Sequence, residues 1–361
     1  MAKLGDVCKK GTSNIAQKDL EGHSGIYPIY GASGFITNVD FYQQENSYIA
    51  VVKDGAGIGR IMKLPAKSSV IGTMQYIIPN DTVDISYLAF AMEHMNLSKY
   101  FTGATIPHIY FKDYQKEELP LPPLDEQRKI AAVLDKVSSL IAKRRQQLDK
   151  LDELIKARFV EMFGDPVTNP NQWEKVPLSD LADVRIGPFG SLLHKEDYIA
   201  GGHPLVNPSH ILDDKIVVDK KLSVSEQKYA ELEPYHLKIG DVVMGRRGEM
   251  GRCAVVQYEG LLCGTGSLLI RTKGNVTADY IQKIISFPSF KKTIEDMAVG
   301  QTMPNLNVPI VSNFQIIKPP LQVQKKYYQF VEQTEKIKTT ISKSLEKLET
   351  LKKALMQEYF G

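Results

Sequence analysis

Two segments of the chain carry apolar side chains at the spacing that is typical of long amphipathic helices. In each segment the apolar residues recur at steps of three and four positions and are flanked by Lys, Arg and Glu. Each segment follows a Pro-Pro pair, at 122–123 or 319–320, and contains no further Gly or Pro until Gly164 or Gly361. Proline ends a preceding helix and is accepted at the start of a new one. The pattern therefore predicts two helices of about 39 residues, each roughly 58 Å long.

The apolar stripe of each predicted helix is narrow. Such a stripe matches the seam of a coiled coil better than the broad apolar face of a helix in a globular core. We therefore expect the two helices to pack against each other along this seam. The predicted seam residues are Leu134, Val137, Ile141, Leu148, Leu151 and Ile155 in the first helix and Val331, Ile341, Leu345, Leu348 and Leu355 in the second.

The two helical segments belong to an internal duplication. Residues 121–127 (Leu-Pro-Pro-Leu-Asp-Glu-Gln) align with 318–324 (Lys-Pro-Pro-Leu-Gln-Val-Gln) at an offset of 197, and 17 of the 62 ungapped positions from Gly103 to Gly164 are identical. Upstream the match fades and the offset slips to 192, where Gly59-Arg60 aligns with Gly251-Arg252. The sequence therefore predicts one unit used twice, roughly over 1–164 and 176–361, as a divergent globular part followed by a better-matched helix.

The linker between the two copies constrains how the helices pair. Its 11 residues, 165–175, are rich in Pro and Asn and span at most ~40 Å when fully extended, which is less than one helix length. Antiparallel pairing removes this difficulty, because the second globular part then begins where the first helix ends. The expected architecture is a pseudo-two-fold dumbbell. Its predicted parts are a first domain at 1–120, a helix at 121–164, the linker at 165–175, a second domain at 176–317 and a helix at 318–361.

The globular parts show short strand patterns and few helical ones. In the first part, 48–52 and 75–78 are predicted strands and 87–95 a short helix. In the second part, 241–244, 254–256 and 268–270 are predicted strands and 280–287 a helix. Neither part alternates strands with long helices as a doubly wound sheet does. The predicted fold class is α+β.

Composition excludes some classes of protein and leaves others open. A chain of 361 residues that is 43% hydrophobic is not a disordered polymer. The formal charge of +3 does not by itself indicate nucleic acid, because binding depends on where the cations lie. The three cysteines form no C-x-x-C pair, so we interpret them as buried thiols of a protein in a reducing compartment. No apolar run approaches the ~18 residues of a membrane span, and the expected location is the cytoplasm.

The sequence offers no catalytic or metal-binding constellation. It lacks the P-loop, G-x-S-x-G and H-E-x-x-H motifs, and its seven histidines show no metal-ligand spacing. The glycine-rich stretches 54–59 and 245–251 are predicted hairpin turns rather than phosphate cradles. Their cations at matched positions suit phosphate contacts, although an ordinary solvated turn is the alternative. The G-x-T-x-P blocks at 103–107 and 300–304 are interpreted as turns that join domain to helix.

Several motifs together make the chain resemble the specificity subunit of Type I restriction–modification enzymes. They are the run 119–127, the helix ending Phe-Gly-Asp-Pro at 163–166, the Gly-Asp-Val-Val block at 240–243 and the repeated G-x-T-x-P blocks. The resemblance covers essentially the whole chain. It implies two target recognition domains for double-stranded DNA, joined by antiparallel helices that dock two methyltransferase (modification) subunits. Restriction (endonuclease and translocase) subunits would join through this core. The second copy departs from the pattern, because Val323 stands before Gln324 where the family has Glu.

The resemblance and the duplication together imply a non-catalytic reader of DNA. Two unlike domains held at a fixed separation would read a bipartite, asymmetric site and position the other subunits on it. The methyl donor, S-adenosylmethionine, would belong to the methyltransferase subunits, which methylate an extruded adenine. This chain has no [D/N/S]-P-P-[Y/F] block, because Leu follows both Pro-Pro pairs. No cofactor is expected on the chain itself.

Cationic and amide side chains near the matched loops are the candidate DNA contacts. Arg pairs with guanine and Asn or Gln with adenine in the major groove, and each such pair contributes ~1–3 kcal/mol of discrimination. The candidates are Lys53, Arg60, Gln75, Thr105 and His108 in the first copy and Arg246, Arg247, Arg252, Thr302 and Asn305 in the second.

Two other classes of function stay open. A coiled-coil adaptor that binds only proteins would explain the helices but not the duplicated domains with their cationic turns. A single-chain enzyme would need a nucleophile or a set of carboxylates that the sequence does not show.

Overall fold

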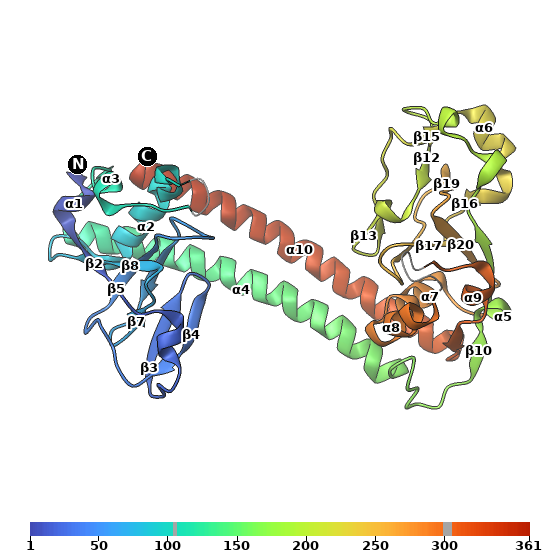
Figure 1. Ribbon diagram of the computed structural model, residues 1–361, viewed down its shortest axis with the longest axis horizontal. Helices are drawn as coiled ribbons and strands as arrows, with labels where there is room; N and C mark the ends of the chain where they lie inside the picture. Colours follow the sequence, from blue (N-terminus) through green and yellow to red (C-terminus); the bar gives the residue numbers. More distant parts are fainter. Residues whose placement is uncertain (104–106, 299–304) are drawn as a thin grey trace. The chain divides into compact units, whose positions relative to one another are not determined.

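The computed structural model describes residues 1–103, 107–298 and 305–361 (Figure 1). The chain divides into two compact units. Unit 1 comprises Met1–Asp149 with Thr339–Gly361, and unit 2 comprises Lys150–Lys338. Two long helices, α4 (Leu124–Phe163) and α10 (Leu321–Phe360), each contribute one segment to each unit.

Unit 1 is built on a four-stranded antiparallel sheet and a smaller sheet beside it. The order of the main sheet is β2-β8-β5-β6, with β2 (Cys8–Thr12), β8 (Met74–Pro79), β5 (Tyr48–Val52) and β6 (Ile61–Leu64). The smaller sheet has the order β4-β3-β7, with β4 (Gly34–Val39), β3 (Tyr27–Gly31) and β7 (Ser69–Val70). The remaining elements are β1 (Ala2–Lys3), α1 (Leu4–Val7), η1 (Gln17–Leu20), α2 (Ile85–Met95), η2 (Leu97–Tyr100), α3 (Phe111–Tyr114) and β9 (Glu118–Leu119).

Unit 2 repeats the strand order of the main sheet, and its second sheet has four strands instead of three. Its main sheet has the order β11-β20-β17-β18, with β11 (Ala182–Ile186), β20 (Ser267–Thr272), β17 (Val242–Gly245) and β18 (Cys253–Val255). Its second sheet has the order β15-β12-β19-β16, with β15 (Ser223–Val224), β12 (His203–Val206), β19 (Leu261–Cys263) and β16 (His236–Leu237). The other strands are β10 (Lys175–Pro177), β13 (Ile211–Leu212), β14 (Lys215–Ile216) and β21 (Gln315–Ile317). The short helices are α5 (Leu178–Leu181), η3 (Gly190–Leu192), η4 (Lys195–Asp197), η5 (Pro208–His210), α6 (Glu226–Glu231), η6 (Glu233–Tyr235), α7 (Ala278–Ile285), α8 (Pro288–Met297) and α9 (Val308–Ser312).

The matching strand order of the two main sheets extends the duplication into the globular parts, where sequence identity is weak. The second sheet of each unit contains one parallel pair, β3 with β7 and β12 with β19. The predicted α+β class is confirmed, and the seven predicted elements correspond to β5, β8, α2, β17, β18, β20 and α7. The helix predicted to reach residue 287 ends at Ile285, because Pro288 starts α8 at its first turn.

The predicted long helices and their antiparallel pairing are confirmed within each unit. In unit 1, Arg145 Nη2 donates to Glu349 Oε1 at 2.6 Å, while Leu134 shares a core with Phe360. In unit 2, Lys338 Nζ donates to Asp152 Oδ1 at 2.6 Å, while Tyr327 OH donates to the carbonyl of Ile155 at 3.3 Å. In both units, higher numbers on α4 face lower numbers on α10.

The seam between the helices is tightest near their ends. Leu134, Val137, Ile141 and Ile155 are buried, and the other seven predicted seam residues are half-buried. Aromatic residues that the pattern did not single out, Phe159, Phe163 and Tyr327, are fully buried in unit 2. The coiled-coil seam therefore merges at its ends into the cores of the globular parts.

The aspartate of the Gly-Asp-Val-Val block has a structural role in unit 2. Asp241 is 2% exposed and accepts from Arg271 through both oxygens, at 2.8 Å from Nε and 2.7 Å from Nη2. Its Oδ2 also accepts from the backbone N–H of Lys238 at 2.7 Å. Hydrogen bonding to Asp241 raises the pKa of the Arg271 guanidinium. This pair ties the start of β17 to its neighbour β20.

The three cysteines are free and buried, as the sequence predicted. Burial raises the pKa of the Cys8 and Cys263 thiols to about 12 and raises that of Cys253 further. Because the thiolate is the reactive form, we expect an aromatic disulfide reagent at pH 8 to leave the folded protein unlabelled for minutes. All three thiols should react in guanidinium. Rapid labelling without denaturant would contradict this prediction.

Along the described parts of the chain, no helix combines the length and the apolar character that a membrane crossing requires.

Candidate nucleic-acid interface

One end of the main sheet in unit 1 gathers three separate segments of the chain. The backbone N–H groups of Lys53 and Asp54, just after β5, donate to the carbonyl of Thr73, just before β8, at 3.0 and 3.2 Å. The N–H of Ile109 donates to the carbonyl of Lys53 at 3.0 Å. Residues 107–109 are thereby held against the strand end.

Unit 2 repeats the same backbone contacts at equivalent positions. The N–H of Arg246 donates to the carbonyl of Gly266 at 3.0 Å, and the N–H of Leu306 donates to the carbonyl of Arg246 at 2.9 Å. The bridge between Arg247 and Asn305 matches the one between Asp54 and His108. We refer to these matched strand ends, with residues 53–60 and 107–109 in unit 1 and 246–252 and 305–306 in unit 2, as the loop ends of the two sheets.

The matched positions carry different side chains. In unit 1, His108 Nδ1 is hydrogen-bonded to Asp54 Oδ1, and Lys53 Nζ lies 3.5 Å from Asp54 Oδ2. The pKa of His108 is lowered, first by burial and then by the charge of Lys53. The Lys53 cation is thus largely compensated by Asp54.

The loop end of unit 2 is more cationic. Arg246 Nε donates to Asn305 Oδ1 at 3.0 Å, and burial followed by the charge of Arg247 lowers the pKa of the Arg246 guanidinium. Among residues 1–103, 107–298 and 305–361, neither Arg246 nor Arg247 forms an ion pair with a carboxylate. Arg247 is exposed. Two adjacent guanidinium groups without an acidic partner suit an anionic ligand.

The glycine-rich stretches form the hairpin turns that the sequence predicted, between β5 and β6 and between β17 and β18. Each turn ends in an arginine that reaches another loop. Arg60 Nη1 donates to the carbonyl of Ala32 at 2.8 Å, and Arg252 Nη1 donates to the carbonyl of Pro208 at 3.3 Å. Their guanidinium groups are therefore already engaged within the protein.

One other candidate residue that the structure describes, Gln75, does not join this surface. Gln75 is 3% exposed, and its side-chain amide donates to the hydroxyl of Tyr114. A base reader needs an accessible amide, so the interpretation of Gln75 as a reader fails because packing against Tyr114 buries it. Thr105 and Thr302 lie outside the described residues.

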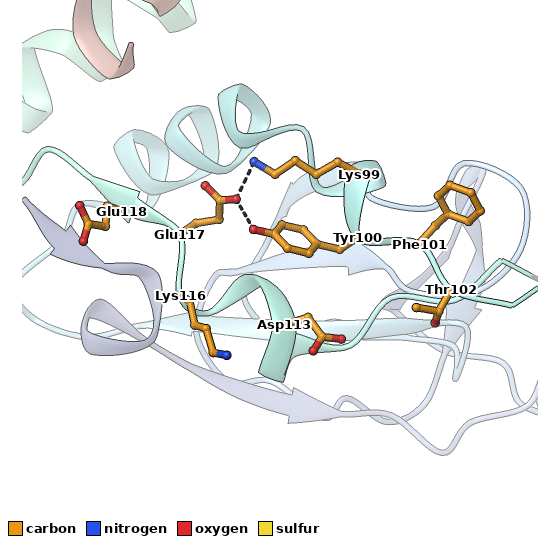
Figure 2. A pocket seen from close by; sticks show the side chains of 8 residues that line it. All are labelled: Lys99, Tyr100, Phe101, Thr102, Asp113, Lys116, Glu117 and Glu118. Atoms are coloured by element: carbon orange, nitrogen blue, oxygen red, sulfur yellow. Dashed lines mark hydrogen bonds and ion pairs between the residues drawn. The ribbon is translucent and has the colours of Figure 1, made fainter.

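A hollow of about 720 Å³ borders the loop end of unit 1 (Figure 2). Lys99 Nζ contacts Glu117 Oε1 at 2.5 Å, and the Tyr100 hydroxyl donates to the same oxygen, so these groups face one another rather than a ligand. At the other end of the hollow Phe101 is 61% exposed. Sequence reasoning missed this aromatic side chain, because nothing in the local pattern distinguishes it from a core residue.

A repeated glutamine fixes each globular part to the start of its long helix. Gln127 is 1% exposed, accepts from the N–H of Asp84 at 2.8 Å and donates to the carbonyls of Pro122 and Thr82 at 2.8 and 3.1 Å. Asp84 is the residue that caps α2, since its carboxylate accepts from the N–H groups of Ser86 and Tyr87.

The second copy makes the same contacts. Gln324 is fully buried, accepts from the N–H of Thr277, which caps α7, at 3.0 Å and donates to the carbonyl of Pro319 at 2.9 Å. A tyrosine adds a further bond in each unit, from Tyr87 to the carbonyl of Pro120 and from Tyr280 to that of Ile317, both at 2.9 Å. We call each glutamine–tyrosine pair a domain–helix lock. The lock explains why Pro-Pro-Leu-x-x-Gln is repeated, and Val323 in place of Glu leaves it intact.

Comparison with known proteins places this architecture in a family. The Type I restriction modification DNA specificity domain matches residues 1–153 and 170–352. The MjaVIII specificity subunit of Methanocaldococcus jannaschii is 23% identical over 392 residues, with 99% of this chain and 90% of that protein covered. The EcoKI specificity subunit of Escherichia coli is 20% identical over 289 residues, with coverage of 73% and 61%.

Solved structures show the same fold. A crystal structure of a Type I restriction–modification S subunit from M. genitalium matches with a TM-score of 0.57 at 15% identity, and covers 100% of this chain and 95% of its own. A structure from work on complex assembly and conformational transition of the Type I system matches with a TM-score of 0.59 at 16% identity, with coverage of 99% and 96%.

Proposed function

Because the chain belongs to the family of Type I restriction–modification DNA specificity subunits, we propose that it reads a bipartite, asymmetric DNA site. Specificity subunits are the non-catalytic component of these complexes. The domains at 1–120 and 176–317 each read one half-site of double-stranded DNA. The helices at 121–164 and 318–361, with the linker at 165–175, set the unread spacing between them.

One observation carries this proposal: equivalent loop ends present different chemistry. The backbone contacts of Lys53 and Arg246 are the same, but the side chains differ, with Lys53 and His108 in one copy and Arg246, Arg247 and Asn305 in the other. Guanidinium and amide groups supply paired major-groove hydrogen bonds, whereas Lys53 is ion-paired with Asp54 and His108 is hydrogen-bonded to the same carboxylate. Unlike half-sites follow from this difference. Thr105 and Thr302 are included as proposed DNA contacts only because each lies in a copy of the repeated G-x-T-x-P block.

Sequencing of methylated DNA tests the proposed function. The chain, combined with its cognate methyltransferase, should direct methylation to one asymmetric two-part motif with a fixed unread spacer. Methylation without sequence preference would reject the reader and favour a coiled-coil adaptor. Turnover by the purified chain alone would favour a single-chain enzyme.

The partner subunits need a docking surface, and the long helices offer a repeated one. Leu140 and Ile337, equivalent at the offset of 197, are 39% and 51% exposed, and Leu154 and Leu351 are 47% and 46% exposed. Leu140 and Leu351 belong to unit 1, whereas Leu154 and Ile337 belong to unit 2. Each unit thus carries the same two exposed aliphatic positions on its helix segments. Exposed apolar groups that form a contiguous patch mark a protein-binding surface, and we propose that these repeated positions contribute to such a patch on each unit.

These exposed positions fit two copies of a methyltransferase subunit, one on each unit. The methyltransferase subunits hold the S-adenosylmethionine that methylates an extruded adenine, and restriction subunits join the resulting core. No cofactor is assigned to this chain.

Charged substitutions at these positions should prevent docking without unfolding the chain. We expect Leu140→Glu with Leu351→Glu to leave one methyltransferase subunit bound, and all four substitutions to leave none, because a buried carboxylate without a partner is strongly unfavourable. Light scattering after size-exclusion chromatography measures the stoichiometry. Val160→Glu is the matched control, since Val160 is 47% exposed and its equivalent, Gln357, is polar. Unchanged stoichiometry in the fourfold variant would contradict this assignment.

A further inference from the structure

The arginines that end the two hairpin turns anchor equivalent loops. Arg60 donates to the carbonyl of Ala32 in residues 31–34, which are the turn between β3 and β4 with the last residue of β3 and the first of β4. Arg252 donates to the carbonyl of Pro208 in residues 207–210, which follow β12. We call 31–34 and 207–210 the anchored loops. They are equivalent because β3 and β12 both lead into them and both pair in parallel with a strand of the second sheet.

The anchored loops lie against the loop ends of the main sheets. In unit 2, the ring of Pro208 packs closely on Gly245 and Gly266, because a Cβ added to these glycines would lie only 3.1 and 3.0 Å from it. Gly245 directly precedes Arg246, so the loop lies beside the loop end. In unit 1, the N–H of Ile71 donates to the carbonyl of Tyr30 at 2.9 Å. Tyr30 directly precedes the anchored loop, and Ile71 lies two residues before Thr73, which is hydrogen-bonded to the loop end. Each anchored loop therefore borders the surface proposed to face DNA.

Each anchored loop presents a hydroxyl at the same place. Ser33 and Ser209 follow the anchored carbonyls of Ala32 and Pro208 directly, and both serines are exposed. Serine hydroxyls donate and accept, so they bond to base edges of either kind. Neither loop was singled out by the sequence.

The surroundings of the two arginines favour a role inside the protein. Arg252 Nη2 donates to Glu249 Oε2 at 2.5 Å, and Glu249 Oε1 also accepts from Lys291 at 3.3 Å. Hydrogen bonding from Arg252 and then from Lys291 lowers the pKa of Glu249, so the carboxylate stays ionised and offsets the charge of Arg252. In unit 1, the guanidinium of Arg60 packs against Gly57 of the same hairpin turn. A Cβ added to Gly57 would lie only 3.1 Å from Arg60 Nη2.

From these contacts we propose that Arg60 and Arg252 are positioning residues for specificity. Each holds one anchored loop in the conformation that presents its serine to a half-site, through a charge-assisted hydrogen bond to a backbone carbonyl. This proposal rests on the proposed function and extends the reading surface from the loop ends to the anchored loops.

The test uses the complete complex with its methyltransferase subunits. Arg60→Ala and Arg252→Ala are compared with the wild type on DNA libraries in which every position of both half-sites is varied. We expect Arg60→Ala to lower the preference for the cognate base pair at least tenfold at two or more positions of one half-site. Arg252→Ala should do the same at the other half-site. The unaffected half-site reports that each variant is folded.

Two results would overturn the proposal. Loss at a single base pair would make the arginine a direct base reader. The arginine would instead be a phosphate contact if discrimination is unchanged and the plot of log binding constant against log salt concentration becomes less steep by about 0.9. A positioning residue should leave that slope unchanged. Failure of the proposed function is distinct, because the wild-type complex would then methylate without sequence preference.

Glu249→Gln provides a second variant that keeps the size of the side chain and leaves Arg252 in place. Loss of the ion pair should let the Arg252 guanidinium move off the Pro208 carbonyl, so discrimination at the same half-site should fall several-fold, less than for Arg252→Ala. If Arg252 reads DNA directly, discrimination should stay the same or rise, because a compensating charge is removed. That outcome would also reject the positioning role.

Discussion

Gln127→Leu and Gln324→Leu are each expected to lower the free energy of unfolding of their unit by about 3 kcal/mol. Leucine fills a similar volume, but it leaves the capping-residue N–H of Asp84 or Thr277 and one or two carbonyls without their partner. An unsatisfied buried polar group costs about 1–3 kcal/mol. Urea unfolding followed by circular dichroism measures the effect as a shift of the transition of the affected unit.

Exposed glutamines on the same helices are the matched controls for the domain–helix lock. Gln147 on α4 and Gln322 on α10 are exposed, and leucine at either position should change the free energy of unfolding by less than about 0.5 kcal/mol. If Gln324→Leu destabilises no more than Gln322→Leu, the lock has no energetic role. Because the lock also sets the angle between domain and helix, methyltransferase complexes that contain the folded variants should methylate the full site more slowly than the wild-type complex.

Arg246→Ala and Arg247→Ala are expected to give the largest losses of DNA recognition. Each removes a guanidinium that has no acidic partner in the described structure and that lies at the loop end of unit 2. Loss of a paired base contact costs ~1–3 kcal/mol, so each substitution should weaken binding of the cognate site by roughly 5- to 150-fold. The double variant should lose specificity at the second half-site only.

Lys238→Ala is the control for charge alone. Lys238 is exposed and precedes β17, so it lies at the end of the main sheet opposite to Arg246. Its loss should change affinity less than twofold at moderate salt. Fluorescence anisotropy with cognate and scrambled duplexes separates specific from non-specific binding. Equal effects of Lys238→Ala and Arg247→Ala would show that only net charge matters and would reject the assigned interface.

Local patterns predicted the parts of the fold that local physics determines. The apolar steps and the absence of Gly and Pro predicted α4 and α10 within a few residues, because helix formation depends on neighbours three and four positions apart. Antiparallel pairing followed from the reach of the linker. The second sheets of both units were missed, since strands such as β3 (Tyr27–Gly31) and β12 (His203–Val206) find their parallel partners far along the chain.

Residue type alone was a poor guide to the interface. Gln75 and Gln127 are both glutamines, yet neither faces solvent. Gln75 packs against Tyr114, and Gln127 is hydrogen-bonded at the junction between a domain and its helix. Arg60 and Arg252 were selected as cations, and their contacts with Ala32 and Pro208 assign them to loops that the sequence did not indicate.

The sequence by itself determined the duplication, the two long helices and the family. A repeat is found by comparing the sequence with itself, and helical periodicity depends on residues three and four positions apart. Only the tertiary structure decided which polar side chains are free to meet DNA. Burial and hydrogen-bond partners come from segments tens to hundreds of positions apart, and no local pattern records which of those segments will meet.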